Sequence, residues 1–322
     1  MNAKQLRIVF MGTPEFAVPS LQALVAGGYN LVGVVTAPDK PAGRGQKLQQ
    51  SEVKVAALAL GLPVLQPEKL KDPAFVAAMQ ALQPDLGIVI AFRMLPEQIW
   101  AMPRLGTFNL HASLLPQYRG AAPLNWAIIN GEQESGVTTF LLNREIDKGA
   151  IIGQVRVPIG EHESVGSLYD RLMHIGTTLV TDTVDRIATG DIHPLEQQHI
   201  DEQTLRPAPK IFKDDCRVDW TWKGRQIINF IRGLSPYPAA WTPMYKEATL
   251  HSTAKIFDAT FEATTHGECC GTVESDGRTF IRVACADGWI TLCELQIAGK
   301  KRLSVNDLLL GLRDISQYRM SN

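Results

Sequence analysis

Along the first two thirds of the chain, short apolar runs alternate with longer segments whose apolar residues recur at helical spacing. The clearest run is residues 86–92, which is apolar throughout, as expected of a strand covered on both faces. Similar strand-like runs occupy residues 6–11, 31–35, 107–111, 137–142 and 151–157. Helix-like segments occupy residues 19–24, 51–60, 75–82, 123–129 and 164–188. This alternation predicts an α/β fold, with a mostly parallel sheet and helices on both of its faces.

The last third of the chain has a different pattern, in which short strand-like segments are separated by turn signals. Asp276-Gly277 and Asp287-Gly288 are residue pairs typical of tight hairpin turns. The predicted strands are residues 249–256, 270–274, 279–284 and 289–297. We therefore predict an α/β domain at residues 1–190, a polar linker at 191–209 and a smaller antiparallel β-barrel at 210–322. Periodicity alone does not separate an OB-like barrel from an SH3-like one.

Composition limits the class of protein. With 45% hydrophobic and 20% charged residues, the 322-residue chain is an ordinary globular protein that is long enough for two domains. No run approaches the roughly 18 apolar residues of a membrane span. The first apolar run is also too short for the core of a signal peptide. We therefore expect a cytoplasmic protein without a membrane partner.

Several familiar motifs are missing from the sequence, which narrows the chemistry. The segment that opens the first helix, Met11-Gly12-Thr13-Pro14-Glu15-Phe16, lacks the G-x-G-x-x-G pattern, which argues against a dinucleotide cofactor. Neither a P-loop nor H-E-x-x-H is present. The five cysteines form no C-x-x-C pair and have no histidine at zinc-finger spacing. We expect reduced thiols and no metal.

Three polar side chains near the middle of the chain indicate a site for acyl-type transfer. Asn109 and His111 are two residues apart on a predicted strand, so their side chains point the same way, with Cα atoms about 6.6 Å apart. An amide donor and an imidazole can then converge on one small group, such as a carbonyl. Asp147 precedes the turn signal Lys148-Gly149. It supplies the carboxylate that an imidazole needs to fix its tautomer and favour its charged form.

Each of the three residues also has an ordinary structural explanation. Asn109 could cap a turn, His111 could be a hydrogen-bonded core histidine, and Asp147 could be a turn carboxylate. Glu145 is a competing acid, because it also lies two residues before a candidate partner position. The motifs around these residues decide between the explanations.

Those motifs form a long, ordered series. They are Asn109-Leu110-His111-Ala112-Ser113-Leu114-Leu115-Pro116, Tyr118-Arg119-Gly120-Ala121-Ala122-Pro123, Gly136-Val137-Thr138 and Asp147-Lys148-Gly149. In this series the chain resembles the 10-formyltetrahydrofolate-dependent formyltransferases, and over its whole length the members that act on initiator methionyl-tRNA. The resemblance implies a Rossmann-like catalytic domain followed by an OB-like, tRNA-binding barrel. It also places the working carboxylate at Asp147 rather than Glu145.

The resemblance implies that 10-formyltetrahydrofolate donates its formyl group to the α-amino group of methionine on initiator tRNA, which leaves tetrahydrofolate. Negative charge develops on the formyl oxygen, so donors already aimed at it stabilise the transition state more than the ground state. Asn109 and protonated His111 suit that role. Asp147 would hold His111 and, through a water, accept the proton that leaves the amine. No covalent nucleophile is needed.

For the folate, the resemblance implies a loop whose backbone groups contact the flat pterin, made by Ser113, Leu114, Leu115 and Pro116. Residues 88–94, among them Ile90 and Phe92, are expected to line the same crevice at the carboxyl end of a central strand. The chain departs from many family members here. Its segment Ala91-Phe92-Arg93-Met94-Leu95-Pro96 is one residue shorter and lacks their glycine. Arg93 could pair with the folate glutamate tail or be a plain surface arginine.

Basic residues in two segments are candidates for contacts with tRNA phosphates. The formal charge of −1 gives no global attraction to nucleic acid, although residues 206–322 are mildly basic. Residues 37–47 are predicted to form a long loop, and composition alone leaves open that it is merely flexible and solvated. The resemblance favours tRNA binding, with Arg44 as the main contact and Lys40 and Lys47 assisting.

The second segment is a turn in the barrel, for which a solvated turn is the alternative explanation. By the resemblance, its cations would contact tRNA phosphates; they are Lys300, Lys301 and Arg302.

The sequence leaves alternatives to this function. Within the same class, the acceptor could be an amino-sugar nucleotide or a purine precursor. A deformylase that hydrolyses the same folate would have no use for the long basic loop. A plain nucleic-acid-binding protein would not need an intact set of Asn109, His111 and Asp147. We expect a monomer.

Overall fold

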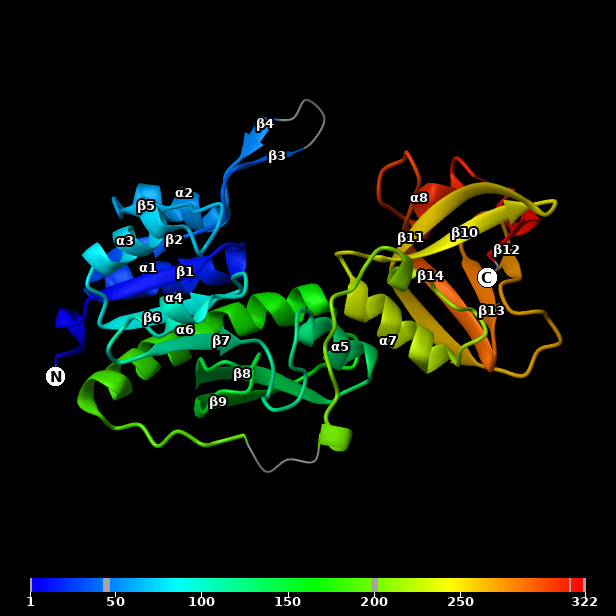
Figure 1. Ribbon diagram of the computed structural model, residues 1–322. Coiled ribbons are helices and arrows are strands. Elements are labelled where there is room, and N and C mark those ends of the chain that lie inside the picture. The colour runs from blue at the N-terminus through cyan, green and yellow to red at the C-terminus, as the bar shows by residue number, and fades with distance from the viewer. Residues whose placement is uncertain (1, 43–46, 198–201, 313, 321–322) are drawn as a thin grey trace. The chain divides into compact units, whose positions relative to one another are not determined.

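The computed structural model describes residues 2–42, 47–197, 202–312 and 314–320 (Figure 1). The chain divides into two compact units. The first unit consists of Met1–Gly120, Ser135–Val157 and Tyr169–Pro207, and the second of Ala121–Glu134, Pro158–Leu168 and Ala208–Asn322. Two short stretches from the first 168 residues thus group with the C-terminal part. The domain boundaries predicted at residues 190 and 210 stay a prediction.

The first unit is built on a seven-stranded sheet with the order β5-β2-β1-β6-β7-β8-β9. Its strands are β1 (Ile8–Gly12), β2 (Leu31–Val35), β5 (Val64–Leu65), β6 (Leu86–Ile90), β7 (Thr107–His111), β8 (Glu134–Leu141) and β9 (Ile151–Pro158). The pairs from β5 to β7 are parallel, and β8 is antiparallel to β7. Strands β8 and β9 are also antiparallel, because the Leu141 amide donates to the Ala150 carbonyl while Gly136 lies against Val155. The mostly parallel α/β sheet predicted from the sequence is confirmed.

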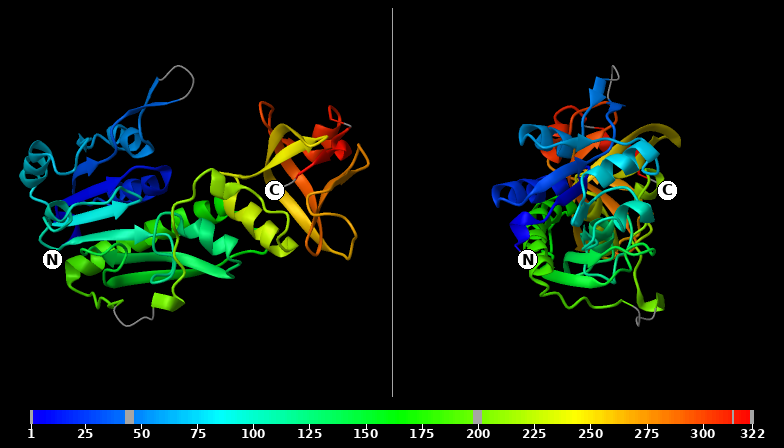
Figure 2. Two further views of the ribbon diagram at one scale, coloured as in Figure 1. Left: turned by 45° about the vertical axis from the view of Figure 1, so that its right-hand side comes forward. Right: turned by 60° about the vertical axis from the view of Figure 1, so that its left-hand side comes forward.

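Helices cover both faces of this sheet (Figures 1 and 2). They are α1 (Val18–Ala26), α2 (Glu52–Ala59), α3 (Pro73–Ala81), α4 (Glu97–Trp100) and α6 (Val165–Thr189). On one face α6 packs on β7 and β8, since Gly176 lies against Leu110 and Thr183 Oγ1 is 2.9 Å from Thr139 Oγ1. On the other face, α3 and α4 form a buried cluster with the sheet that includes Val9, Met11, Phe75, Met79, Val89, Leu95 and Ile99. We call these the α6 face and the α3/α4 face.

The basic segment predicted as a loop contains a β-hairpin, which corrects that expectation. Strand β3 (Lys40–Ala42) pairs with β4 (Lys47–Gln49), and Figure 1 shows the hairpin extending beyond the sheet of the first unit. Asp39 fixes its base by accepting hydrogen bonds from Lys54 Nζ at 2.6 Å and Gln66 Nε2 at 2.8 Å. The hydrogen bond from Lys54 holds the pKa of Asp39 below its usual range. Pairing gives backbone partners to the two short stretches β3 and β4, which the composition of the segment did not reveal.

The described part of the second unit contains an antiparallel barrel together with helices α5 (Pro123–Ile129), α7 (Gly224–Leu234) and α8 (Val305–Leu309). Its strands are β10 (Ala240–Lys246), β11 (Thr249–Ala263), β12 (Val273–Ser275), β13 (Ile281–Cys285), β14 (Gly288–Ile297), β15 (Leu303–Ser304) and β16 (Tyr318–Arg319). The sheet runs β12-β13-β14-β11-β10-β16, and a bridge between Thr272 and Arg319 joins its two ends. This closure confirms the predicted OB-like barrel. Short 3₁₀ helices complete the chain at Ala3–Gln5, Glu15–Ala17, Glu202–Thr204, Asp214–Cys216 and Ile315–Gln317.

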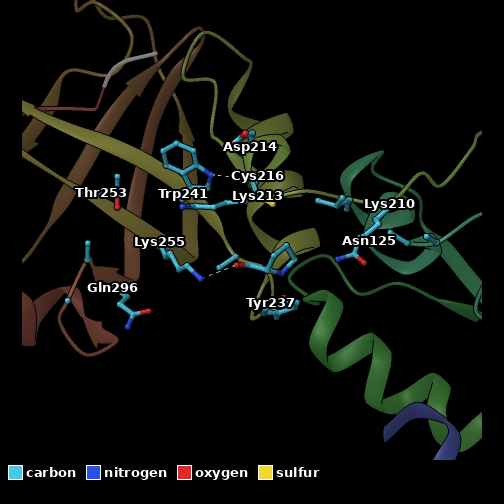
Figure 3. Close-up of a pocket in the computed structure, with 17 residues that line it drawn as sticks. Asn125, Lys210, Lys213, Asp214, Cys216, Tyr237, Trp241, Thr253, Lys255 and Gln296 are labelled. Atoms are coloured by element: carbon cyan, nitrogen blue, oxygen red, sulfur yellow. Dashed lines mark hydrogen bonds between the residues drawn. The ribbon is translucent and has the colours of Figure 1, made fainter. Parts of the chain in front are cut away.

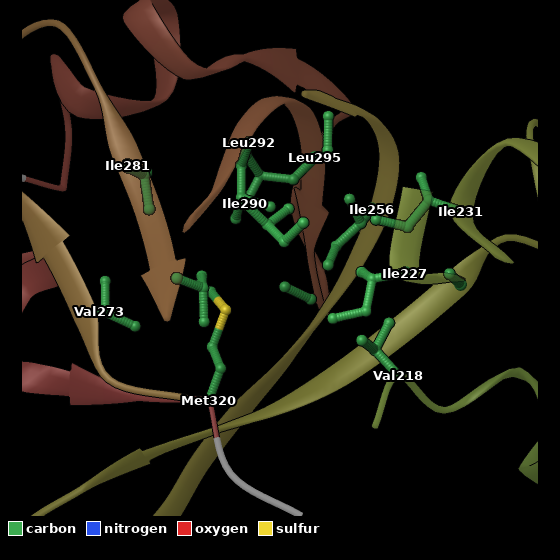
Figure 4. Packing of buried hydrophobic residues seen from close by; sticks show 14 of the residues in the cluster. Val218, Ile227, Ile231, Ile256, Val273, Ile281, Ile290, Leu292, Leu295 and Met320 are labelled. Atoms are coloured by element: carbon green, nitrogen blue, oxygen red, sulfur yellow. The ribbon is translucent and has the colours of Figure 1, made fainter. Parts of the chain in front are cut away.

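Helix α7 covers the barrel core and was not predicted. Ile227 and Ile231 of α7 pack among buried residues of several strands, including Ile256, Ile281, Ile290, Leu292 and Leu295 (Figure 4). Its apolar residues at 227, 228, 231 and 234 have helical spacing, so the signal was present in the sequence. Within the same core, the buried Trp220 donates its Nε1–H to Thr242 Oγ1 at 3.0 Å.

The structure also bears on the expectations about membrane spans and cysteines. Among the described residues, no helix combines the length and apolarity needed to cross a membrane. All five cysteines are free thiols, and burial raises the pKa of Cys216 and Cys285 above the usual value for a thiol.

Candidate active site

Strand β7 places Asn109 and His111 on the α3/α4 face of the sheet. Asn109 is in register with Val89 of β6, and residues in register on adjacent strands point to the same side. Val89 belongs to the cluster on the α3/α4 face, whereas Leu110 lies against α6. Asn109 and His111 therefore share a face, as the sequence predicted. His111 is the last residue of β7, near the carboxyl ends of β1 and β6, where the strand order reverses and ligand sites open in such sheets.

The hydrogen bonding of His111 defines which ring nitrogen carries a proton. The side chain is only 7% exposed and packs edge-on against Phe140, with ring centroids 6.5 Å apart. Its Nε2 is 2.9 Å from the carbonyl oxygen of Tyr118. Because a carbonyl only accepts, Nε2 must be the donor in this bond. Donation from His111 to a second group would therefore use Nδ1 and require the charged imidazolium.

Asn109 has a hydrogen-bonding atom to spare. Its side chain is half-buried, and within the described part of the chain its buried Oδ1 has no hydrogen-bond partner. A 180° rotation of the side-chain amide exchanges its oxygen and nitrogen, so the atom without a partner can be an acceptor or a donor. Leaving such an atom unpaired costs about 1–3 kcal/mol, which a bound substrate would recover. This orphaned atom fits a site that takes a small polar group.

Asp147 lies in the loop between β8 and β9, in a backbone conformation that is rare for a residue with a side chain. Its φ is +55°, and its Oδ2 accepts a hydrogen bond from the Gly120 amide at 3.0 Å. No hydrogen bond joins Asp147 to His111 in the described residues. Instead, both bond to the stretch Tyr118-Arg119-Gly120, His111 at its first residue and Asp147 at its last. One short loop thus holds both groups.

The competing acid Glu145 is engaged elsewhere. Its side chain is 64% exposed and forms an ion pair with Lys148, with Oε2 and Nζ 3.0 Å apart. That Asp147 rather than Glu145 works with the β7 residues stays a prediction.

Gly149 is required by the close approach of two strands. A Cβ at this position would lie 1.6 Å from the carbonyl oxygen of Leu141, a backbone atom that cannot move aside cheaply. We predict that Gly149→Ala displaces the adjacent Asp147 and lowers kcat/KM on the order of 10²-fold. Gly267→Ala is the matched control, since nothing lies within 4 Å of its added Cβ. Wild-type kinetics in both variants would contradict this role for Gly149.

The loop predicted to face the pterin is held by Thr138 of the Gly136-Val137-Thr138 motif. Thr138 Oγ1 donates to the Ser113 carbonyl at 2.7 Å and accepts from the Leu115 amide at 3.2 Å. The Leu115 carbonyl accepts from Gln154 Nε2 at 2.7 Å, and Pro116 follows through a cis peptide bond. Several backbone groups of this loop are thus already bonded within the protein. That Ser113, Leu114, Leu115 and Pro116 contact folate stays a prediction.

The two other residues expected to line the folate crevice lie on different faces of the sheet. Ile90 is fully buried and in register with Leu110, so its side chain points to the α6 face, away from Asn109 and His111. Alternation along β6 is the reason, so a folate contact by Ile90 would use its backbone, and that contact stays a prediction. Phe92 lies beyond the end of β6, half-buried against the cluster on the α3/α4 face.

Arg93 has a structural role that the sequence did not settle. Its guanidinium donates to the backbone carbonyls of Glu68, at 2.8 Å, and Pro67. Burial lowers the pKa of this guanidinium, and its Nε has no partner among the described residues. Arg93 therefore ties the segment after β6 to the segment after β5. Bonded in this way, it is not a plain surface arginine.

Sequence reasoning missed Gln197, which bonds to the Asp147 loop. Gln197 is 7% exposed; its Nε2 donates to the carbonyls of Gly149 at 2.6 Å and Asp147 at 3.2 Å. Its Oε1 accepts from Arg119 Nη2 at 2.8 Å. Gln197 lies in the polar connector that was predicted to be a linker. No periodicity or motif marked it.

The structure describes all but one of the residues predicted to contact tRNA. Lys40 is exposed on β3, Lys47 begins β4, and Arg44 lies outside the described residues. In the second unit, Lys300 and Lys301 are exposed in the turn between β14 and β15. Arg302 is committed within the protein, because it pairs with both carboxylate oxygens of Glu294 and stacks on Phe257, 4.1 Å from the ring centroid. Arg302 is therefore a poorer candidate for a phosphate contact than its neighbours.

A pocket of about 790 Å³ lies wholly within the second unit, and basic and aromatic side chains line it (Figure 3). Three lysines contribute to the lining: Lys210, Lys213 and Lys255. Trp241 forms part of the wall and donates its Nε1–H to the Lys213 carbonyl at 2.8 Å, while Tyr237 is 81% exposed. Among the described residues that line the pocket, Asp214 is the only acid, so the lining carries a net positive charge.

Comparison with known proteins identifies the class. Residues 6–184 match the family described as formyl transferase, and residues 210–313 match the formyl transferase C-terminal domain. HypX from Aquifex aeolicus in complex with tetrahydrofolic acid has the same fold, with TM-score 0.62, 19% identity, and 96% of this chain and 47% of that chain covered. So has an N-formyltransferase from Helicobacter canadensis, in complex with folinic acid and dTDP-3-aminofucose, with TM-score 0.63, 19% identity, and 93% and 100% covered. The two domain matches show that the chain is a formyl transferase, and its fold is that of these solved proteins.

Full-length relatives narrow this class further. The chain is 55% identical over 321 residues to a methionyl-tRNA formyltransferase of Parabacteroides distasonis, with 99% of both chains covered. It is 54% identical over 322 residues to a methionyl-tRNA formyltransferase of Bacteroides thetaiotaomicron, with 100% of both covered. The chain belongs to the methionyl-tRNA formyltransferase family, and the resemblance stated from its motifs is confirmed.

Proposed function

We propose that this protein transfers the formyl group of 10-formyltetrahydrofolate to the α-amino group of initiator methionyl-tRNA, giving N-formylmethionyl-tRNA for translation initiation. The observation that carries the proposal is identity above 50% over the full length to enzymes of that name. The pairing of Asn109 with His111 on one sheet face supports it. The site of action would be the cytoplasm, where aminoacyl-tRNA serves translation.

The folate supplies an activated formyl group, and the residues on β7 act on its oxygen. In the transfer, the methionyl nitrogen bonds to the formyl carbon, the bond from that carbon to the folate nitrogen breaks, and charge develops on the formyl oxygen. The Asn109 amide and the charged His111, through Nδ1, donate to that oxygen. Fixed donors of this kind need no reorganisation as the charge grows.

Asp147 stabilises the positive charge of His111 and accepts the proton of the attacking amine. A carboxylate near an imidazole favours the imidazolium form, which His111 needs in order to donate from both nitrogens. Asp147 Oδ2 is held by the Gly120 amide, so in this proposal Oδ1 is the oxygen that acts on the substrate. Catalytic hydrogen bonds are often completed only when substrate binds, so direct contact with His111 is expected in the complex. The amine proton leaves through a water to this carboxylate, which then returns a proton through water to the folate nitrogen as the bond from that nitrogen to the formyl carbon breaks.

In the second unit, we propose that the basic pocket and the nearby turn hold tRNA phosphates. Lys210, Lys213 and Lys255 provide the positive charge, and Gly299, which precedes Lys300, also lines the pocket. Lysines that contact phosphates release counterions from the nucleic acid, which makes the affinity depend on salt concentration. The protein would act as a monomer and without a metal; both stay predictions.

The hairpin of the first unit is the other proposed tRNA contact. We predict that Arg44→Ala weakens binding of methionyl-tRNA several-fold and lowers the slope of log affinity against log salt by about one. Binding titrations over a series of salt concentrations measure both quantities. Lys71→Ala, which removes an exposed lysine elsewhere in the first unit, is the control. An unchanged affinity for Arg44→Ala would remove this residue from the interface.

A comparison of acceptors tests the function as a whole. Purified protein is mixed with 10-formyltetrahydrofolate and, in separate reactions, initiator methionyl-tRNA, an amino-sugar nucleotide, a purine precursor, or no acceptor. We expect formylation of methionyl-tRNA alone. The amino-sugar nucleotide is the main alternative, because a solved neighbour of the same fold was crystallised with dTDP-3-aminofucose. Formylation of either small acceptor in preference to methionyl-tRNA would refute the proposal.

A further inference from the structure

We infer that Gln197, in the connector that follows α6, is a positioning residue for Asp147 in the proposed formyl transfer. The inference rests on the proposed function for its kinetic consequence. Its structural part stands on hydrogen bonds that lie within the first unit. The connector would then be part of the catalytic site rather than a tether between two parts of the chain.

The partners of Gln197 leave one orientation for its amide. Arg119 can only donate, so the atom that faces it must be the oxygen Oε1. The carbonyls of Asp147 and Gly149 can only accept, so the atom that faces them must be the nitrogen Nε2. All three bonds are satisfied at once only in this way. Gln197 thus joins the loop after β7 to the loop after β8.

Asp147 needs this support because of its backbone. A residue with a side chain at φ of +55° is strained, and such a conformation persists only where its surroundings hold it. Gln197 bonds the backbone of Asp147 and of Gly149, two residues on, while the Gly120 amide bonds the Asp147 carboxylate. Without the donor from Gln197, the loop is free to relax, and the carboxylate turns away from the β7 residues.

The same connector also supports the group that holds His111. The Tyr118 amide donates to the Arg206 carbonyl at 2.8 Å, and the Tyr118 carbonyl accepts from His111. In return, the Arg206 amide donates to Gln117 Oε1 at 2.8 Å. Both proposed catalytic side chains are therefore fixed through one loop that the connector anchors at Gln197 and Arg206.

Gln197→Glu separates a positioning role from a purely structural one. The new carboxylate keeps the size of the side chain and its bond to Arg119, but it can no longer donate to the two carbonyls. We expect kcat to fall about 10-fold to 100-fold, with KM for folate and for methionyl-tRNA near wild type. The two carbonyls that lose their donor should lower the melting temperature without unfolding the protein. Gln226→Glu is the matched control, because Gln226 uses only its Oε1, which accepts from the Lys223 amide. Wild-type kcat in Gln197→Glu would overturn the inference.

A double-mutant cycle tests whether Gln197 acts through Asp147. If it does, Gln197→Glu combined with Asp147→Asn is no slower than Asp147→Asn alone. Multiplying losses would mean that Gln197 acts elsewhere and would overturn the inference. Gln197→Met, which removes the donor without adding charge, repeats the cycle and the melting measurement.

Hydrogen exchange decides the structural part independently of activity. The Gly120 amide is protected by its bond to Asp147, so its exchange should speed up in Gln197→Glu and Gln197→Met but not in Gln226→Glu. Unchanged exchange in both Gln197 variants would overturn the inference. An inactive wild-type protein would instead refute the proposed function, and the exchange result would still decide the role of Gln197.

Discussion

His111→Ala should bind folate normally and lose turnover on the order of 10²–10³-fold, a loss of about 2.7–4 kcal/mol of transition-state stabilisation. The reason is that the lost group donates to an oxygen that becomes anionic only during transfer, so the ground state is little affected. Single-turnover kinetics with methionyl-tRNA, together with equilibrium binding of the folate, separate the two effects.

A second variant keeps this test independent of the fold. His111 bonds the Tyr118 carbonyl, so alanine leaves a buried carbonyl unpaired and could shift the loop. His111→Gln keeps a donor of similar reach but cannot carry charge. Both variants should be slow while binding folate as the wild type does. Normal turnover in either one would exclude charge on His111 from the mechanism.

Asp147→Asn should lower kcat on the order of 10²–10⁴-fold, the usual range for a group that moves or balances a proton. Asparagine retains an oxygen for the Gly120 amide, so the loop keeps its bond while the negative charge is lost. The melting temperature and the KM for both substrates are the accompanying measurements.

Glu145→Gln is the natural control for Asp147→Asn. It removes the other acid of the same loop, whose ion pair is with Lys148. We expect it to be nearly as active as the wild type. If Glu145→Gln were the slow variant and Asp147→Asn the active one, the assignment of the carboxylate would be reversed.

The architecture could be predicted from the sequence because local patterns determine it. The apolar run at β6 and the alternation of strands with amphipathic helices define the parallel sheet, and the Asp-Gly pairs define hairpins in the barrel. Helix α5 was predicted with its observed bounds, since Pro123 marks its first turn. Helix α7 was not predicted, although Ile227 and Ile231 have helical spacing and pack in the barrel core.

The sheet face on which each side chain lies, and the contacts that hold the loops, could be predicted only in part. Strand alternation placed Asn109 and His111 together, and the same rule applied to β6 would have turned Ile90 away from them. Pairing of β3 with β4 depends on backbone contacts between two stretches that the sequence placed in one long basic loop. The bonds of Gln197 and Arg93 join segments far apart in sequence, to backbone carbonyls that every residue possesses. Such contacts leave no pattern in the chain.

A crystal structure of the protein with bound folinic acid tests the central claim most directly. The account predicts that the formyl oxygen lies within hydrogen-bonding distance of the Asn109 amide and His111 Nδ1 on the α3/α4 face, with Asp147 turned toward the same group. A folate bound on the α6 face, or one whose formyl group lies away from both residues of β7, would contradict it.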